Sequence, residues 1–274
     1  MTINCNGKLI SLDQPKVMGI LNVTPDSFFD GGKYKDDSSI LRQVEKMVNE
    51  GATFIDIGAY STRPGALEVD EANELKRIVP IISLILQKFP EAMLSIDTFR
   101  SNVARECIGN GAAIINDISA GLHDDNMLST VANLNVPYIM MHMRGTPQNM
   151  QQKTEYKDIL KEILLFFSER LSLAKSLGIK DILIDPGFGF AKNLNQNYEI
   201  LRQLEMMSFI DHPLLVGISR KSMIYKILDT TADQALNGTT ALHMICLQKG
   251  AKILRVHDVK EAMECVKLQE QLNA

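Results

Sequence analysis

The sequence VMGILN at residues 17–22 is the first of eight short apolar runs that each stop at a polar residue or a glycine-rich turn. The others are TFIDIG (53–58), MLSID (93–97), AIIND (113–117), YIMMH (138–142), ILID (182–185), LLVGIS (214–219) and KILRVH (252–257). Runs that are apolar throughout, rather than alternating, indicate parallel strands buried on both faces. Because helix-like stretches separate the eight runs, the sequence predicts a closed (β/α)₈ barrel.

The stretches between the runs carry helical spacing. From residue 39 to 50, the apolar positions Ile40, Val44, Met47 and Val48 lie on one face of a helix, and Gly51 ends it. A chain of 274 residues with 45% hydrophobic content is normal for one such barrel. We therefore expect a single domain spanning residues 1–274, in which residues 1–16 cover the bottom of the barrel.

Composition narrows the class of partner. A formal net charge of -4 with 23% charged residues argues against a nucleic-acid or acidic-membrane surface and favours a small ligand. The four cysteines are scattered, which signals neither a zinc site nor a disulfide scaffold. The N-terminus has no apolar signal core, and the most apolar stretch, 78–86, is too short to span a bilayer. These features predict a cytoplasmic protein.

Three hydrogen-bond acceptors end three of the runs. Asp97, Asn116 and Asp185 would meet at the barrel mouth, since the carboxyl ends of the strands surround the active site in this fold. Buried carboxylates are costly unless a partner donates hydrogen bonds, so the three together predict a flat, donor-rich heterocycle as ligand. The alternative is that each residue caps the helix that follows it.

The turn PGFGF follows Asp185 directly. Gly187 and Gly189 would let the backbone approach a ligand closely, and Phe188 or Phe190 could supply an aromatic wall.

A basic group accompanies the seventh and eighth runs. Lys221, Arg255 and His257 lie where barrels commonly bind phosphate, and residues 219–222 open a predicted helix there. This basic group predicts a ligand that carries a phosphate or a carboxylate. For Arg220 alone, we expect an exposed surface position.

Asn22 could supply one oxygen to a Mg²⁺ ion otherwise held by waters and phosphate oxygens, or it could merely hold the following turn. His142 has no His or carboxylate partner nearby in the sequence, which indicates a hydrogen-bonded structural residue.

Eight segments resemble, in order and in place, the motif blocks of the dihydropteroate synthase family. They run from about residue 17 to residue 259: NVTPDSFFDGG, GAYSTRPGA, SIDTF, INDISAG, MHMRGTPQNMQ, LIDPGFGFAKN, GISRKS and RVHDV. The resemblance implies a transferase of folate biosynthesis on a (β/α)₈ barrel. Such enzymes join 6-hydroxymethyl-7,8-dihydropterin diphosphate to p-aminobenzoate and release pyrophosphate, and sulfonamides compete with p-aminobenzoate.

The resemblance also implies a role for each matching residue. The pterin ring would be held by Asp97, Asn116, Asp185 and Lys221, with Arg255 over its face. The diphosphate would be held by Asn22, Arg63, Arg255 and His257, with Asn22 on Mg²⁺. The p-aminobenzoate pocket would be formed by Thr62, Pro64, Phe190, Ser219 and Phe28. Lys221, Arg255, His257 and Arg63 would carry catalysis.

In the mechanism implied by the resemblance, pyrophosphate leaves first and the neutral aryl amine attacks the exposed carbon, with Asp26 or Asp30 steadying the cation. The family is usually homodimeric. Two departures bear on the p-aminobenzoate pocket and on sulfonamide sensitivity: Tyr60 replaces an acidic residue, and Ala191 replaces a glycine. A related pterin barrel that transfers methyl groups to a corrinoid protein, and a non-catalytic pterin-binding barrel, are the alternatives.

Overall fold

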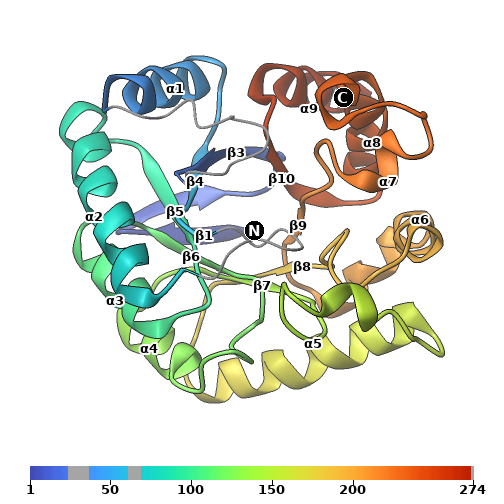
Figure 1. Ribbon diagram of the computed structural model, residues 1–274, viewed down its shortest axis with the longest axis horizontal. Coiled ribbons are helices and arrows are strands. Elements are labelled where there is room, and N and C mark those ends of the chain that lie inside the picture. The colour runs from blue at the N-terminus through green and yellow to red at the C-terminus, as the bar shows by residue number, and fades with distance from the viewer. Residues whose placement is uncertain (24–36, 61–68, 273–274) are drawn as a thin grey trace.

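The computed structural model describes residues 1–23, 37–60 and 69–272. Eight parallel strands close into a barrel in the order β10-β3-β4-β5-β6-β7-β8-β9, with helices around the outside (Figure 1). The strands are β3 (Lys16–Asn22), β4 (Phe54–Gly58), β5 (Met93–Asp97), β6 (Ile114–Asp117), β7 (Tyr138–Met141), β8 (Ile182–Asp185), β9 (Leu214–Val216) and β10 (Ala251–Val256). The predicted barrel is confirmed.

The helices lie outside the barrel and cover the strands. They are α1 (Asp37–Asn49), α2 (Glu71–Lys88), α3 (Ser101–Gly109), α4 (Met127–Leu134), α5 (Ile159–Ser176), α6 (Leu194–Arg202), α7 (Ser222–Tyr225), α8 (Leu236–Gln248) and α9 (Val259–Leu272). Short 3₁₀ helices lie at Met150–Gln152, Leu204–Ile210 and Ala232–Gln234. Among the helices in the described ranges, none combines the length and the apolar character that a membrane span requires.

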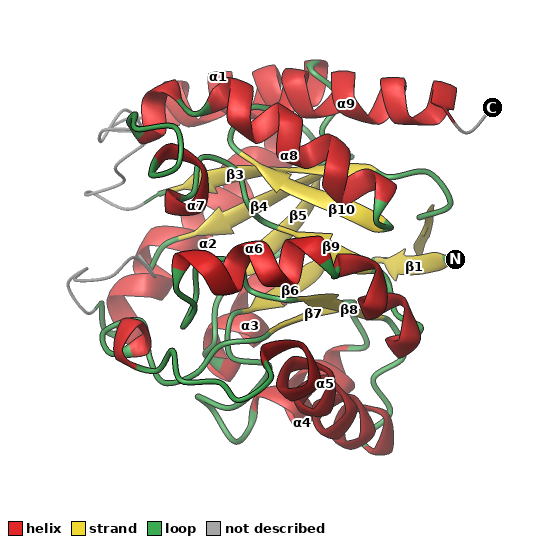
Figure 2. Cartoon of the chain, turned by 90° about the vertical axis from the view of Figure 1, so that its right-hand side faces the viewer, coloured by secondary structure: helices red, strands yellow, loops and turns green. Residues whose placement is uncertain are grey.

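An antiparallel hairpin lies at the end of the barrel where the strands begin (Figure 2). It consists of β1 (Thr2–Cys5) and β2 (Lys8–Ser11). Its buried Ile3 and Cys5, with Leu12, pack against the inward-facing Phe54, Ile114 and other residues near the strand starts. The hairpin thereby keeps water out of one end of the barrel and leaves the opposite end for a site.

The strand pleat sends every second residue into the barrel. Phe54, Ile114, Leu183 and Ile253 belong to the apolar cluster at the bottom. Two residues further along the same strands lie Asp56, Asn116, Asp185 and Arg255. The interior therefore changes from an apolar bottom layer to a charged upper layer within one pleat repeat, which determines where a polar ligand can bind.

Candidate active site

A buried network of charges fills the upper layer. The Arg255 Nε donates to Asp56 Oδ2 over 2.6 Å, and its Nη2 donates to Asp97 Oδ2 over 2.8 Å. The Asn116 Nδ2 donates to the same Asp56 oxygen over 3.0 Å. Because the amide nitrogen of Asn116 is used in this way, its carbonyl oxygen is left to accept from a ligand. Four strands thus contribute to one hydrogen-bonded cluster.

Burial changes the proton affinity of this cluster. Desolvation raises the pKa of Asp97 to about 7, although the Arg255 guanidinium opposes the rise. For Arg255, burial lowers the pKa, but Asp56 and Asp97 outweigh burial and raise it above its usual value. Arg255 is therefore a permanent cation, and Asp97 is a carboxyl group that titrates near neutral pH.

Asp185 lies at the end of β8, three strands away from the β5 strand of Asp97 in the barrel order. Its Oδ1 accepts from the Gly187 N–H over 2.7 Å, and burial raises its pKa, with Lys221 as the main opposing charge. Burial lowers the pKa of Lys221 to about 8, and Asp185 opposes that decrease. The pair brings a carboxylate and an ammonium group to one wall of the mouth.

Asp97, Asn116 and Asp185 do not cap the helices that follow them. The residue at the start of α3 is Arg100, which makes no side-chain cap, and α6 begins at a capping box formed by Asn193. Asp117, the outward neighbour of Asn116, accepts from the backbone of Ser119 and holds its own loop. The capping alternative for the three acceptors is therefore wrong.

Gly187 in the PGFGF turn is required for a different reason from the predicted one. Gly187 has a φ of +70°, and a Cβ there would stand 2.1 Å from the His142 carbonyl oxygen. The protein's own backbone, rather than a ligand, makes that close approach. Phe188 is fully buried in the outer core, so Phe190 alone of the two aromatic candidates lies beside Lys221, whose Nζ is 4.7 Å from the ring centroid.

Ser219 and His257 contact each other at the neighbouring edge of the mouth. The Ser219 Oγ lies 3.1 Å from His257 Nδ1 and also accepts from the His257 N–H over 3.2 Å. The predicted helix begins at Ser222, as α7, and is only four residues long. The two side chains connect the segments that follow β9 and β10. Ser219, assigned to p-aminobenzoate, therefore lies beside His257, assigned to the diphosphate.

The expected surface position of Arg220 is wrong. Its guanidinium makes a two-bond ion pair with Asp258, Nε to Oδ2 over 2.6 Å and Nη2 to Oδ1 over 2.8 Å. Only 9% of its side chain is exposed. The ion pair links Arg220, which lies between the site residues Ser219 and Lys221, to Asp258, which follows His257.

Replacing Arg220 with methionine is expected to lower the free energy of unfolding by about 1.5 to 3 kcal/mol, because a half-buried carboxylate loses two charge-assisted bonds. Urea denaturation measures the change. The same substitution at the exposed Lys180 serves as the control. A loss at Arg220 no larger than at Lys180 would show that the ion pair contributes nothing.

Asn22 ends β3 next to Gly58. A Cβ at Gly58 would stand 3.7 Å from Asn22 Oδ1 and 3.7 Å from Asp97 Oδ2, so the glycine leaves room between two hard oxygen donors. In the described ranges, no group of three or more His, Cys, Asp and Glu residues is arranged to hold a metal. One or two oxygens suit Mg²⁺, which keeps several of its waters.

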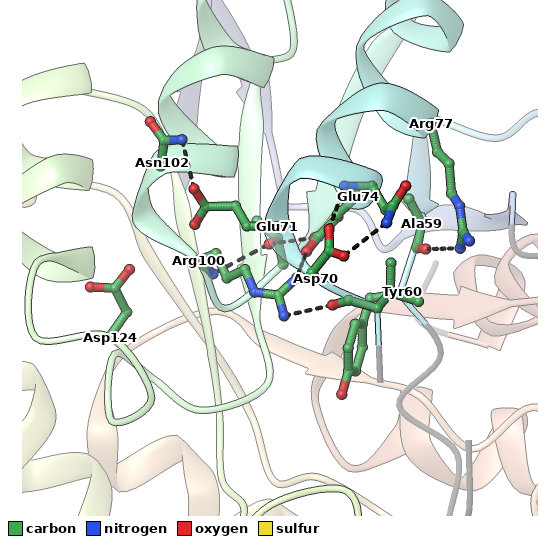
Figure 3. Close-up of polar contacts among 12 residues, drawn as sticks. Ala59, Tyr60, Asp70, Glu71, Glu74, Arg77, Arg100, Asn102 and Asp124 are labelled. Atoms are coloured by element: carbon green, nitrogen blue, oxygen red, sulfur yellow. Dashed lines mark hydrogen bonds and ion pairs between the residues drawn. The ribbon is translucent and has the colours of Figure 1, made fainter. Parts of the chain in front are cut away.

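Figure 3 shows the polar contacts that hold the chain on either side of residues 61–68. The Arg100 Nη2 donates to the Val69 carbonyl over 2.7 Å, and its guanidinium lies 5.3 Å from the centre of the Tyr60 ring. Arg100 is itself held by Glu74. Tyr60 packs edge-on against Phe99, so the residue that departs from the family pattern takes part in an aromatic cluster.

Four predicted loop residues lie outside the described residues, together with the two aspartates considered for the cation. They are Phe28, Thr62, Arg63 and Pro64, with Asp26 and Asp30. The structure brings the remaining predicted residues, Asn22, Asp97, Asn116, Asp185, Phe190, Ser219, Lys221, Arg255 and His257, to the same end of the barrel.

Sequence reasoning missed Asp56. It is fully buried on β4, and its Oδ1 has no hydrogen-bond partner among the described residues. The sequence does contain an indication of this residue, since TFIDIG has an aspartate inside a run that is otherwise apolar on both faces. A carboxylate in such a place requires a buried cation, which Arg255 supplies.

Comparison with known proteins settles the family. A family model described as pterin binding enzyme matches residues 18–257. The dihydropteroate synthase of Escherichia coli is 43% identical over 98% of this chain and 96% of that protein. The chain belongs to the dihydropteroate synthase family. It is therefore a transferase of folate biosynthesis, as the motif blocks predicted.

Solved structures of the same family agree over the whole chain. A dihydropteroate synthase from Yersinia pestis with a sulfonamide drug complex has a TM-score of 0.95 at 42% identity, covering 100% of this chain and 99% of that one. One from Xanthomonas albilineans with 4-aminobenzoic acid has a TM-score of 0.92 at 37% identity, covering 100% and 98%.

Proposed function

We propose that this chain condenses 6-hydroxymethyl-7,8-dihydropterin diphosphate with p-aminobenzoate to give 7,8-dihydropteroate and pyrophosphate. The observation that carries the proposal is the convergence of Asp97, Asn116 and Asp185 with Arg255 and Lys221 in the mouth of a barrel from this family. Acceptors and cations alternate around one small space, which suits a ring rich in N–H donors with an anionic tail.

The pterin ring is assigned to the inward acceptors. Asp185 and Asp97 would accept from its amino and ring N–H groups, the free oxygen of Asn116 would accept another, and Lys221 would donate to its carbonyl. The Lys221 ammonium already donates to the Phe188 carbonyl, so a pterin carbonyl would replace or share that partner. Arg255 would cover the ring face while Asp56 and Asp97 hold its guanidinium in place.

The anionic groups are assigned to the neighbouring edge. Asn22, Arg63, Arg255 and His257 would hold the diphosphate. Phe28, Thr62, Pro64, Phe190 and Ser219 would form the p-aminobenzoate pocket, and sulfonamides would compete there. The hydrogen bond between Ser219 and His257 supports an arrangement in which the two substrates lie side by side.

Mg²⁺ is proposed as cofactor, with Asn22 supplying an oxygen and Asp97 close by. When bound, the ion would neutralise charge on the departing pyrophosphate. In the reaction itself, the bond between the pterin methylene carbon and the diphosphate oxygen breaks, and the oxygen keeps the electron pair. The amine nitrogen then bonds that carbon and releases one proton. Arg255 and His257 stabilise the leaving group.

A homodimer in the cytoplasm is proposed for the assembled protein, on the pattern of the family. Exposed apolar side chains on the outer helices are consistent with a second copy: Ile227 and Ile245 on and beside α7 and α8, and Leu268 on α9. Sedimentation equilibrium would test the assembly directly, and a monomer at all concentrations would contradict it.

The experiment that tests the activity supplies both substrates with Mg²⁺ and follows dihydropteroate and pyrophosphate together. Equal amounts of the two products are expected. Binding of pterin without either product would favour a pterin-binding barrel instead. Transfer of a methyl group from methyltetrahydrofolate would favour the corrinoid-linked alternative.

Pterin affinity is expected to peak between about pH 7 and about pH 8. Below this range Asp97, with its raised pKa of about 7, becomes protonated and loses the negative charge that makes it a strong acceptor for the ring N–H groups. Above it Lys221, with its lowered pKa of about 8, loses the proton that it donates. Fluorescence titration at a series of pH values measures both limbs. Because pterin can itself titrate, Lys221→Met is the control: the alkaline limb should shrink in that variant, and its persistence would exclude Lys221.

A further inference from the structure

The side-chain nitrogen of Lys192 is buried and is not used by the reaction described above. Lys192 is 3% exposed, although it stands at the end of the loop that follows β8. Its Nζ donates to the carbonyls of Gly187 and Phe190 over 2.9 Å each and to the His142 carbonyl over 3.3 Å. It also lies 3.0 Å from His142 Nδ1. A lysine is rarely buried so completely unless its partners justify the desolvation.

All four partners are uncharged. Burial lowers the pKa of His142 to about 2, so the imidazole is neutral and its Nδ1 accepts from Lys192. Burial also places the pKa of Lys192 well below its usual value, with Asp185 as the main opposing charge. Lys192 is thus held by three backbone carbonyls and one imidazole, and Asp185 favours its charged form through space.

The loop from Pro186 to Lys192 is fixed from two sides. Lys192 holds the Gly187 and Phe190 carbonyls from the core side, while Lys221 holds the Phe188 carbonyl from the mouth side. The Gln151 Nε2 donates to the remaining carbonyl, that of Gly189, over 3.2 Å. Every carbonyl from residue 187 to residue 190 therefore has a side-chain donor.

This arrangement determines where Phe190 lies. A shift of the loop would move the Phe190 ring, which lies beside the Lys221 ammonium, whereas Lys221 itself belongs to the start of α7 and not to the loop. Asp185 depends on the loop less, because it belongs to β8 and its backbone carbonyl accepts from the His142 N–H over 2.9 Å. Loss of the core-side anchor should affect the second substrate more than the pterin.

We infer that Lys192 is a positioning residue: its buried side-chain nitrogen fixes the loop after β8 from the core side, so that Phe190 presents its ring to p-aminobenzoate. The inference rests on the proposed function. His142 helps to hold the Lys192 Nζ, since its carbonyl oxygen and its neutral ring make two of the four contacts.

The test is Lys192→Met in the full chain, with Lys180→Met as the matched control at the exposed start of the same strand segment. Steady-state kinetics give KM for each substrate and kcat, and thermal unfolding gives stability. We expect KM for p-aminobenzoate to rise about tenfold or more, since several carbonyls lose their donor. KM for the pterin diphosphate and its binding affinity should change by at most about threefold.

A lowered melting temperature with both KM values unchanged would overturn the inference, because Lys192 would then act on stability alone. An equal rise in both KM values would also overturn it. If Lys192→Met does not fold, Lys192→Gln keeps one donor, and a folded Lys192→Gln with unchanged KM for p-aminobenzoate would overturn it as well. An inactive wild-type protein would instead contradict the proposed function, which separates the two failures.

Discussion

Asp185→Ala is expected to abolish pterin binding. The carboxylate is buried at the end of β8, where it faces Lys221 and Arg255, and the ring donors of the ligand would lose their charged acceptor. Unpaired buried donors cost about 1.5 to 3 kcal/mol or more, equivalent to about 10- to 150-fold in Kd at the least. Isothermal titration of the wild type and the variant with 6-hydroxymethylpterin measures the loss.

Two controls separate charge from shape. Asp185→Asn keeps the side-chain volume and removes the charge, so it should lose most of the same affinity. Asp125→Ala removes an exposed carboxylate from the connection between β6 and α4. This variant should bind pterin like the wild type. Wild-type affinity in Asp185→Ala would remove Asp185 from the pterin site.

Asp56→Ala should disable the enzyme and also destabilise it. Asp56 has no exposed surface, and it is a partner of both Arg255 and Asn116. Removing one member of a buried ion pair lowers the free energy of unfolding by about 3 to 5 kcal/mol. We expect a loss at the lower end of this range, because Arg255 is 19% exposed and keeps its ion pair with Asp97. Since a misplaced guanidinium would no longer match the substrate, kcat/KM should fall about 100-fold.

A double-mutant cycle tests whether Asp56 acts through Arg255. The variants are Asp56→Ala, Arg255→Ala and the two together, compared by urea denaturation and by kcat/KM. If the two residues form one unit, the double variant should be at least about 1 kcal/mol more stable than the sum of the single losses predicts. Additive losses would mean that Asp56 stabilises the barrel independently of Arg255.

The sequence predicted the strands well because continuous apolar runs are a direct consequence of burial on both faces. It was less exact where turns cut a run short: the seventh run extends to Ser219, whereas β9 ends at Val216, before Gly217. Strand pleating also separates neighbours that look alike in sequence. Asn116 faces the mouth, and Asp117 faces outward into its own loop.

The rest of the site depends on partners that are distant in sequence. Asp56 and Arg255 are separated by 199 positions, and Arg220 and Asp258 by 38. A charge with such a partner is indistinguishable in sequence from an exposed one, which is why Arg220 was expected at the surface. Likewise, Gly187 reads as a residue that approaches a ligand until the His142 carbonyl is seen beside it.

The most direct measurement is a crystal structure with the pterin diphosphate and p-aminobenzoate bound. We predict that the pterin amino group lies within about 3.2 Å of the Asp185 carboxylate, with the phosphates on the His257 side. A separate cavity of about 480 Å³ lies outside the barrel mouth, lined in part by Phe166, Glu169 and Arg144. A pterin bound in that cavity, with the barrel mouth left without ligand, would contradict the assignment of the inward acceptors.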